Sequence, residues 1–230
     1  MKNHTNLIPS TTGRLIAIGD IHGHSEVLIK LLDSIVPQED DTIIFLGDLV
    51  NRGPSSKQVI DVVLELANKC SVYAICGNHE EMILAAYQGG SSEHNYWCKF
   101  GGIETLASYG VQNAKSLPSD HLLFIAECND YLESEEFIFV HAGCDPDKDL
   151  SQNTGSELRW NFLDKNQKPH ITGKPIVCGH SCLKDVFNIG HIICIDTGCG
   201  ILEDGKLTAM DVKLGKIWQI DVSRKNLIEG

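Results

Sequence analysis

The first ninety residues of the chain repeat one order three times: an apolar run, a turn that contains glycine, and a segment with helical spacing. The apolar runs are 14–18, 42–46 and 72–75, and the helical segments are 26–35, 55–68 and 80–87. Alternation of this kind is typical of parallel sheets with right-handed crossovers. The repeat therefore predicts an α/β fold whose first strands run parallel.

The remainder of the chain adds more strands than a single sheet can bury. Further strand-like runs lie at 137–140, 175–178, 191–195, 206–212 and 217–222, so we expect a second sheet. Residues 95–109 are predicted to be partly helical, and the polar segment 144–175 to form a loop or short helices. The length suits one domain, so we expect a single domain over 14–230 after a loose polar tail at 1–13.

The charge of the chain excludes one class of partner. The net charge is -12, whereas a protein that holds nucleic acid by its phosphates needs a basic face. Phosphate chemistry is still allowed, because bound divalent cations would invert the local field.

The cysteines and the N-terminus indicate a reducing compartment. The chain has nine cysteines, an odd number, and begins without the apolar core of a signal peptide or any run long enough to span a membrane. We therefore expect a cytoplasmic protein with reduced thiols. A zinc site formed by Cys178, Cys182, Cys194 and Cys199 is conceivable, but two of these cysteines lie inside apolar runs and we interpret them as buried hydrophobes.

Five of the apolar runs end in turns that carry side chains able to bind a metal. These side chains are Asp20, His22, Asp48, Asn78, His141 and His180. Each is more often a turn, cap or core residue when it occurs alone. Ligands of open α/β sheets, however, bind at the carboxyl ends of the strands, and so many such residues at successive strand ends favour a metal site.

The ligand types predict two metal ions. Asp20 and His22 are two residues apart, which in extended backbone places both side chains on one side. The two carboxylate oxygens of Asp48 can bridge two ions. Oxygen and nitrogen ligands without thiolate suit Mn²⁺, Fe or Zn²⁺. Two such ions polarise a phosphoryl group and make water a nucleophile near neutral pH.

Two further residues are suited to act on a substrate. His79 directly follows Asn78 but should point elsewhere, so it is free to protonate a leaving oxygen. The planar guanidinium of Arg52 can hold phosphate oxygens.

The turns resemble those of the phosphoprotein phosphatase family within the calcineurin-like metallophosphoesterases. The matching segments are 19–23, 47–53, 77–80, 141–143 and 179–180, and segments 100–110, 195–198 and 205–209 resemble the bacterial and phage serine/threonine phosphatase branch. The resemblance implies an α/β/β/α sandwich of two mixed β-sheets flanked by helices. It also implies a dinuclear centre, with Mn²⁺ as the first expectation. Asp20, His22 and Asp48 would hold one metal, and Asp48, Asn78, His141 and His180 the other. Arg52, Asn78 and His79 would contact phosphate, and Asp48, Arg52 and His79 would form the catalytic set.

One departure from the family concerns Asn51. Protein phosphatases of the family usually carry Asp at this position, where it raises the pKa of the catalytic histidine. A neutral Asn51 would support protonation of His79 less well. A serine alkoxide needs that proton on leaving, whereas a phosphate group needs it much less. Relatives of the diadenosine tetraphosphatase type also lack the Asp.

A second departure lies at residues 158–162. Bacterial relatives often end this segment in an arginine that binds phosphate, but here Phe162 holds that place and Arg159 lies three residues earlier. Arg159 is therefore a candidate phosphate-binding residue. The alternative, which has at least equal weight, is that Arg159 is a surface charge or part of an ion pair.

These patterns leave three hypotheses open. The first is a serine/threonine protein phosphatase that hydrolyses phosphomonoesters of a phosphoprotein or a small phosphorylated substrate. The second is a hydrolase of diadenosine tetraphosphate or related dinucleoside polyphosphates. The third is a metal- or phosphate-binding module without turnover. No nucleic-acid or membrane partner is expected, and the oligomeric state is left open.

Overall fold

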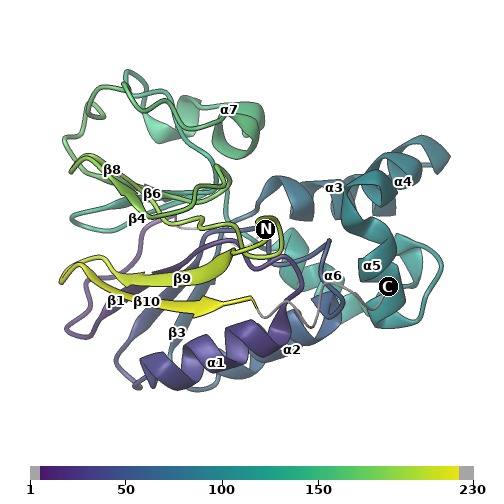
Figure 1. The fold of residues 1–230 in the computed structure, drawn as a ribbon. Coiled ribbons are helices and arrows are strands. Elements are labelled where there is room, and N and C mark those ends of the chain that lie inside the picture. The colour runs from purple at the N-terminus through teal and green to yellow at the C-terminus, as the bar shows by residue number, and fades with distance from the viewer. Residues whose placement is uncertain (1–5, 223–230) are drawn as a thin grey trace.

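The computed structural model describes residues 6–222 and contains two five-stranded sheets (Figure 1). The first sheet has the order β10-β9-β1-β2-β3. Its strands are β1 (Leu15–Ile18), β2 (Thr42–Phe45), β3 (Ser71–Ala74), β9 (Lys206–Asp211) and β10 (Lys216–Asp221). The first three run parallel, as the repeat predicts, while β9 and β10 are antiparallel additions at one edge.

The second sheet is built from the later strands in the order β4-β5-β6-β8-β7. These strands are β4 (Tyr131–Glu133), β5 (Ile138–Val140), β6 (Ile176–Cys178), β7 (Phe187–Asn188) and β8 (Ile192–Cys194). The three central strands are parallel and the two edge strands are antiparallel. The prediction of two mixed sheets is confirmed.

Side chains alternate between two sides of the first sheet, as strand geometry requires. Leu15 and Ala17 of β1 pack toward the second sheet, in a cluster with Phe139 and Val177. Ile16 and Ile18 face the other way, toward α1 (Ser25–Ile35) and α2 (Ser56–Leu66). Both sides of this sheet are therefore buried, which explains the nearly continuous apolar runs of β1 and β2.

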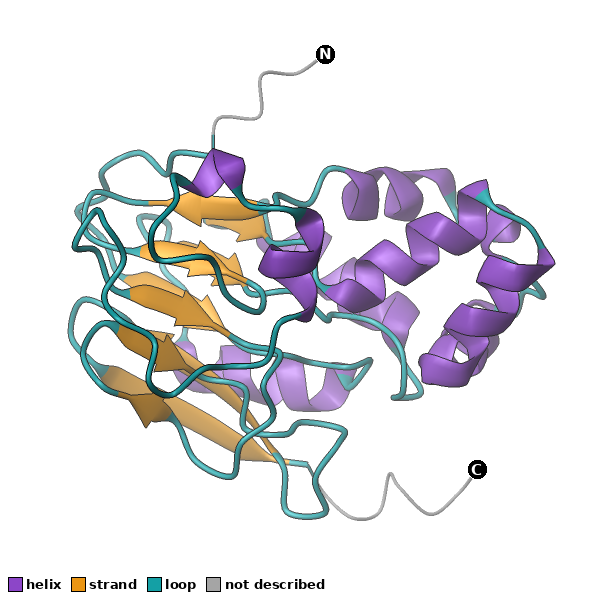
Figure 2. Cartoon of the chain, turned by 90° about the horizontal axis from the view of Figure 1, so that it is seen from above, coloured by secondary structure: helices purple, strands orange, loops and turns teal. Residues whose placement is uncertain are grey.

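The remaining helices gather at one end of the sheets (Figure 2). They are α3 (Asn78–Gln88), α4 (Ser91–Trp97), a π-helical turn (Cys98–Gly102), α5 (Ile103–Tyr109) and α6 (Ser119–Ala126). The outer face of the second sheet is covered by residues 144–163, which include a 3₁₀ turn (Leu150–Gln152) and α7 (Gly155–Trp160). No helix in residues 6–222 is long and apolar enough to cross a membrane.

The sequence predicts a loose tail over residues 1–13, but residues 6–8 are held in place. The backbone N–H of Ile8 donates to Glu133 O at 2.7 Å, and that of Glu133 donates to Asn6 O at 2.7 Å, so residues 6–8 lie along β4. The Ile8 side chain is buried between the sheets. The polar composition of residues 1–13 concealed this anchor, and residues 1–5 lie outside the described part.

A half-buried ion pair between Arg14 and Asp41 ties the start of β1 to the start of β2, and a further hydrogen bond from Arg14 reaches the end of α1. Arg14 donates from Nε and Nη2 to Asp41 at 2.9 and 2.5 Å, and from Nη1 to Ile35 O at 3.1 Å. Burial raises the pKa of Asp41, but the hydrogen bonds from Arg14 and Gln38 outweigh it and hold that pKa below its usual range.

We predict that Asp41→Asn lowers the free energy of unfolding by roughly 1.5–3 kcal/mol at pH 7, because the variant loses a charge-assisted hydrogen bond. The depressed pKa means that this stabilisation is present above the pKa of the unfolded chain, about 4, and is lost as pH falls through the folded pKa. Urea denaturation of both proteins at pH 7 checks the value. The exposed neighbour Asp40 supplies the control, Asp40→Asn. Equal losses in the two variants would contradict the assignment.

Candidate metal centre

The structure brings the six predicted ligands to the carboxyl ends of strands in both sheets. Asp20 and His22 follow β1, Asp48 follows β2 and Asn78 begins the helix after β3, while His141 and His180 follow β5 and β6 of the second sheet. Ligand atoms of Asp48, His141 and His180 lie within 4.8 Å of one another, and the same holds for His22, Asp48 and His79. The two groups share Asp48.

The carboxylate of Asp48 lies between the two groups. Its Oδ2 is 3.8 Å from His22 Nε2, and its Oδ1 is 3.4 Å from His141 Nε2. Each oxygen thus faces a different histidine, which is the arrangement that a bridging ligand requires.

Two histidines are fixed in the tautomer that a metal needs. His141 Nδ1 is 2.8 Å from Leu46 O and His22 Nδ1 is 3.4 Å from Val50 O, so each Nδ1–H donates to a backbone carbonyl. Their Nε2 atoms face inward with a free lone pair. Burial lowers the pKa of His141 to about 4 and also lowers the pKa of His22, so both rings are neutral at pH 7.

Asp20 lies close to this centre but outside both groups. Its carboxylate accepts the backbone N–H of His180 at 3.1 and 3.2 Å. Burial, followed by the charges of Asp196 and Asp48, raises its pKa well above the usual range. His22 has a φ of 47°, so the backbone at this residue turns and is not extended. The predicted extended geometry of the Asp20–His22 pair is therefore wrong.

The surroundings of Asn78 fit a cation. Its side-chain oxygen is 3.1 Å from His141 Nε2, and this amide atom also lies 3.2 Å from each Asp48 oxygen and 3.3 Å from His180 Nδ1. His141 Nδ1 donates to Leu46 O, so its Nε2 is an acceptor in the neutral ring, and both Asp48 oxygens are acceptors when ionised. An amide oxygen that faces these three acceptors needs a positive charge among them. Without a cation, the amide would turn its nitrogen inward.

The buried carboxylates of Asp48 and Asp20 also need a nearby positive charge. Burial raises the pKa of Asp48 to about 8, although a hydrogen bond from the His79 backbone N–H, at 3.0 Å, opposes the shift. Asp20 is likewise buried. Because unpaired buried carboxylates are costly, divalent cations would stabilise these ionised groups. The residues therefore fit a divalent metal site.

The backbone around the site is held in a conformation that is rare for ordinary residues. His22, Asp48, Asn51, Arg52 and His180 all have positive φ, between 47° and 71°. Val36 is the sixth such residue other than glycine in residues 6–222. Strain of this kind clusters at functional sites and persists only where surrounding contacts hold it.

Two glycines permit the close approach of the ligands. A Cβ at Gly77 would lie 2.2 Å from Asp48 Oδ1, and a Cβ at Gly179 would lie 2.1 Å from Asp20 Oδ1. Any side chain at these positions would displace the carboxylates.

Glu80 supports the site, although the sequence pattern indicates only that it begins a helix. It is fully buried and accepts three backbone N–H groups, from Asp48 at 2.8 Å, Leu49 at 2.9 Å and Gly77 at 2.9 Å. Burial raises its pKa to about 8, and the three donors oppose that shift. Its position directly after Asn78 and His79 is the sequence feature that could have indicated a supporting role.

Asp196 is a second residue without a predicted role. It follows β8, and its Oδ1 accepts the Gly198 N–H at 3.0 Å, while its Oδ2 is buried without a partner in residues 6–222. Burial raises its pKa to about 6. In the sequence, only the family resemblance of residues 195–198 points to this segment.

The zinc site that four of the cysteines made conceivable finds no support in the described part of the chain. Cys178, Cys194 and Cys199 are buried free thiols, and the candidate metal groups found in residues 6–222 contain no cysteine. The interpretation of these residues as buried hydrophobes is supported.

The centre opens into a cleft of about 620 Å³. Four predicted ligands line it, together with Arg52 and His79; these ligands are His22, Asp48, Asn78 and His180. Arg52 is exposed and forms no ion pair within residues 6–222, so its guanidinium is available to a ligand.

Arg159 lies elsewhere. Its Nη2 is 2.6 Å from Asp130 and its Nη1 is 3.6 Å from Glu81, and it does not line the cleft. Its assignment to phosphate remains a prediction, and these contacts favour the ion-pair alternative.

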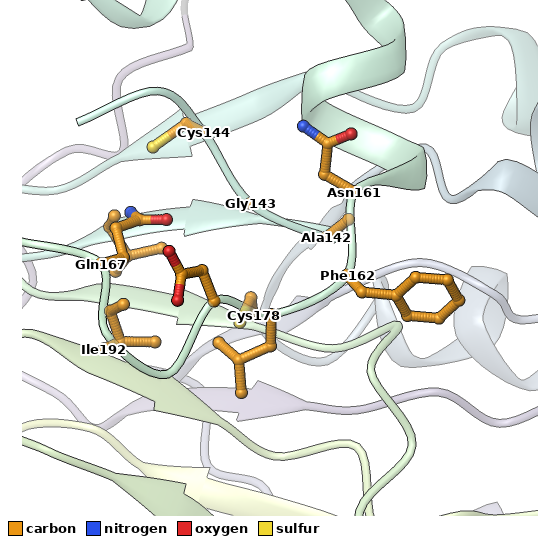
Figure 3. Close-up of a pocket in the computed structure, with 11 residues that line it drawn as sticks. Ala142, Gly143, Cys144, Asn161, Phe162, Gln167, Cys178 and Ile192 are labelled. Atoms are coloured by element: carbon orange, nitrogen blue, oxygen red, sulfur yellow. The ribbon is translucent and has the colours of Figure 1, made fainter. Parts of the chain in front are cut away.

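A second cavity of about 310 Å³ adjoins the cleft (Figure 3). Leu163 and Phe162 line both spaces, but the ring of Phe162 points away from this cavity. The segment 161–164 therefore separates the two.

We predict that chelator-treated protein binds two equivalents of Mn²⁺, measured by isothermal titration calorimetry. His180→Ala should weaken one of these sites by at least roughly tenfold, because it removes a direct ligand. His191, whose Nε2 contacts Gln167 O at 2.7 Å, supplies the control His191→Gln, which should bind normally. Unchanged binding by His180→Ala would contradict the ligand assignment.

Comparison with known proteins agrees with this geometry. A model of the calcineurin-like phosphoesterase family matches residues 13–213. The bis(5′-nucleosyl)-tetraphosphatase PrpE (asymmetrical) of Geobacillus sp. strain WCH70 is 28% identical over 229 residues, covering 84% of this chain and 87% of that protein. A protein of the same name from Oceanobacillus iheyensis is 27% identical over 221 residues, covering 84% and 86%.

Solved structures confirm the fold. The crystal structure of a candidate diadenosine tetraphosphatase has a TM-score of 0.73 at 23% identity, covering 95% of this chain and 97% of that one. A serine/threonine phosphatase from Saccharomyces cerevisiae has a TM-score of 0.60 at 15% identity, covering 92% and 80%. The chain therefore belongs to the calcineurin-like phosphoesterase family and is a phosphoric ester hydrolase.

Proposed function

We propose that this hydrolase cleaves a phosphoric anhydride bond in dinucleoside tetraphosphates. The observation that carries the proposal is the hydrogen bond between Asn51 Nδ2 and His79 Nδ1, at 2.8 Å. The direction of that bond determines whether His79 can act as a strong acid.

The orientation of the Asn51 amide is fixed by its other partners. Trp97 Nε1 and Thr105 Oγ1 each lie 2.8 Å from Asn51 Oδ1. An indole N–H can only donate, so the atom facing Trp97 must be the amide oxygen. The amide nitrogen then faces His79, and it can only donate.

His79 must accept at Nδ1 as a consequence. Its proton is therefore on Nε2, which lies in the cleft 3.9 Å from Asp48 Oδ2. A second proton on Nδ1 would point at the amide hydrogens of Asn51. Burial lowers the pKa of His79, and the charge of Arg52 lowers it further. The ring is thus held neutral.

A neutral imidazole suits some leaving groups better than others. An alkoxide leaving from a phosphoserine needs a proton in the transition state, which an imidazolium supplies well. A nucleotide phosphate leaves as a stable anion, and the Nε2–H of a neutral ring can donate a hydrogen bond to it. The geometry at Asn51 therefore favours anhydride cleavage.

The other residues would bind and orient the substrate. Arg52 would hold non-bridging phosphate oxygens through its planar fork. Asp20, His22, Asp48, Asn78, His141 and His180 would hold two divalent ions, with Mn²⁺ as the first expectation. When bound, such ions polarise the phosphoryl group and supply an activated water.

The names of the relatives support the same substrate class. The relatives at 27–28% identity that match most of this chain are named as tetraphosphatases. They favour the second hypothesis over the serine/threonine phosphatase that the resemblance suggested first.

We predict that the Mn²⁺-loaded protein has a higher kcat/KM for diadenosine tetraphosphate than for a phosphoserine peptide, by at least about tenfold. Product analysis by anion-exchange chromatography gives the bond that is cleaved. A preference for the phosphopeptide would refute the proposal.

Asn51→Asp tests the physical argument itself. An Asp can keep the hydrogen bonds from Trp97 and Thr105 with one oxygen and accept Nδ1–H from His79 with the other, so an imidazolium becomes stable. We expect kcat for the phosphopeptide to rise by at least roughly tenfold, within the usual range for acid catalysis, and kcat for the anhydride to change much less. The same pair of measurements in a His79→Gln background should show no gain. Equal gains on both substrates in the single variant would contradict the argument.

A further inference from the structure

Phe162 is the most exposed of the large hydrophobic side chains in residues 6–222. It is 80% exposed, although it lines the cleft that contains the candidate metal centre. One such side chain on a surface is ordinary, but its position beside a charged catalytic site is not explained by packing.

The ring of Phe162 is positioned by a stacking contact. Its centroid lies 5.3 Å from that of His180, with an angle of 28° between the planes. One face therefore rests on the imidazole, while the exposure shows that much of the ring is open to solvent. Figure 3 shows the ring pointing away from the adjoining cavity.

The cleft that Phe162 lines also has cationic side chains, one of which, Lys165, has its Nζ 5.6 Å from the centroid of the Phe187 ring. Arg52 and Lys165 are the two cationic side chains of the cleft, and Lys165 is exposed and belongs to the same loop as Phe162. A phosphate chain held by Arg52 and the metal ligands would therefore pass close to an open aromatic face. Trp160 and Phe100 add further aromatic surface to the cleft.

We propose that Phe162 is the platform on which a nucleobase of the substrate stacks. This inference rests on the proposed function, because it names what the same site recognises. Bases stack on aromatic side chains without regard to sequence, since every base has a π-face. Such a contact would distinguish a nucleotide from a bare polyphosphate.

Phe162→Leu removes the aromatic face and keeps an apolar side chain. The probes are adenosine 5′-(α,β-methylene)diphosphate and methylenediphosphonate, which resist hydrolysis and differ by the adenosine. Binding of both to the Mn²⁺-loaded full chain is measured by calorimetry. Loss of one stacked base corresponds to a change on the order of tenfold in Kd.

We expect Phe162→Leu to weaken the adenosine compound by about this factor and to leave methylenediphosphonate unchanged, while Phe162→Trp retains the wild-type ratio. Leu214, which is 77% exposed and does not line the cleft, supplies the control Leu214→Ala. If the ratio of the two Kd values is the same in Phe162→Leu as in the wild type, whether both affinities are unchanged or both fall equally, the inference is overturned.

Parallel assays of diadenosine tetraphosphate hydrolysis separate this inference from the proposed function. If Phe162→Leu changes the ratio of the two Kd values but the wild-type protein does not cleave diadenosine tetraphosphate, base stacking is supported and the proposed function is refuted. Cleavage together with a ratio that is insensitive to Phe162 would refute base stacking alone.

Discussion

The arrangement of the site depends on one buried carboxylate, that of Glu80. It accepts backbone N–H groups from the turn after β2 and from the turn after β3, and so fixes these two strand ends against each other. The first turn carries Asp48 and the second carries Asn78 and His79. Asp48 has a positive φ, and the hydrogen bond from its own N–H to Glu80 is one of the contacts that hold this strained conformation.

Charge and hydrogen-bond direction then divide the site into two parts. Around Asp48, neutral histidines turn their Nε2 atoms toward buried carboxylates, which is an environment that a divalent cation completes. Around His79, the direction of donation runs from Trp97 to Asn51 and from Asn51 to the imidazole, so the ring is held in one neutral tautomer. In the proposed function, the first part would hold the metal and the second would determine which leaving group is favoured. Both consequences follow from which atoms can donate and which can only accept.

Local patterns were sufficient to predict much of this structure. The strands β1, β2 and β3 and their helices were predictable because apolar runs and helical spacing are local signals, and parallel topology then brought the ligands to one region. The supporting contacts were not predictable in this way. Trp97 and Thr105 lie 46 and 54 residues from Asn51, and their role exists only in the folded chain. The extended geometry assumed for Asp20 and His22 failed because His22 adopts a left-handed turn. Ile8 was missed because its burial depends on β4, a strand that the sequence did not reveal.

The central claim is that the Asn51 amide holds His79 as a neutral ring protonated at Nε2. Nitrogen-15 NMR of histidine-labelled protein loaded with a diamagnetic metal such as Zn²⁺ tests it directly, with the His79→Gln spectrum used to assign the signals. The account predicts an unprotonated Nδ1 and a protonated Nε2 for His79 at pH 7. An imidazolium with protons on both nitrogens at that pH would contradict it.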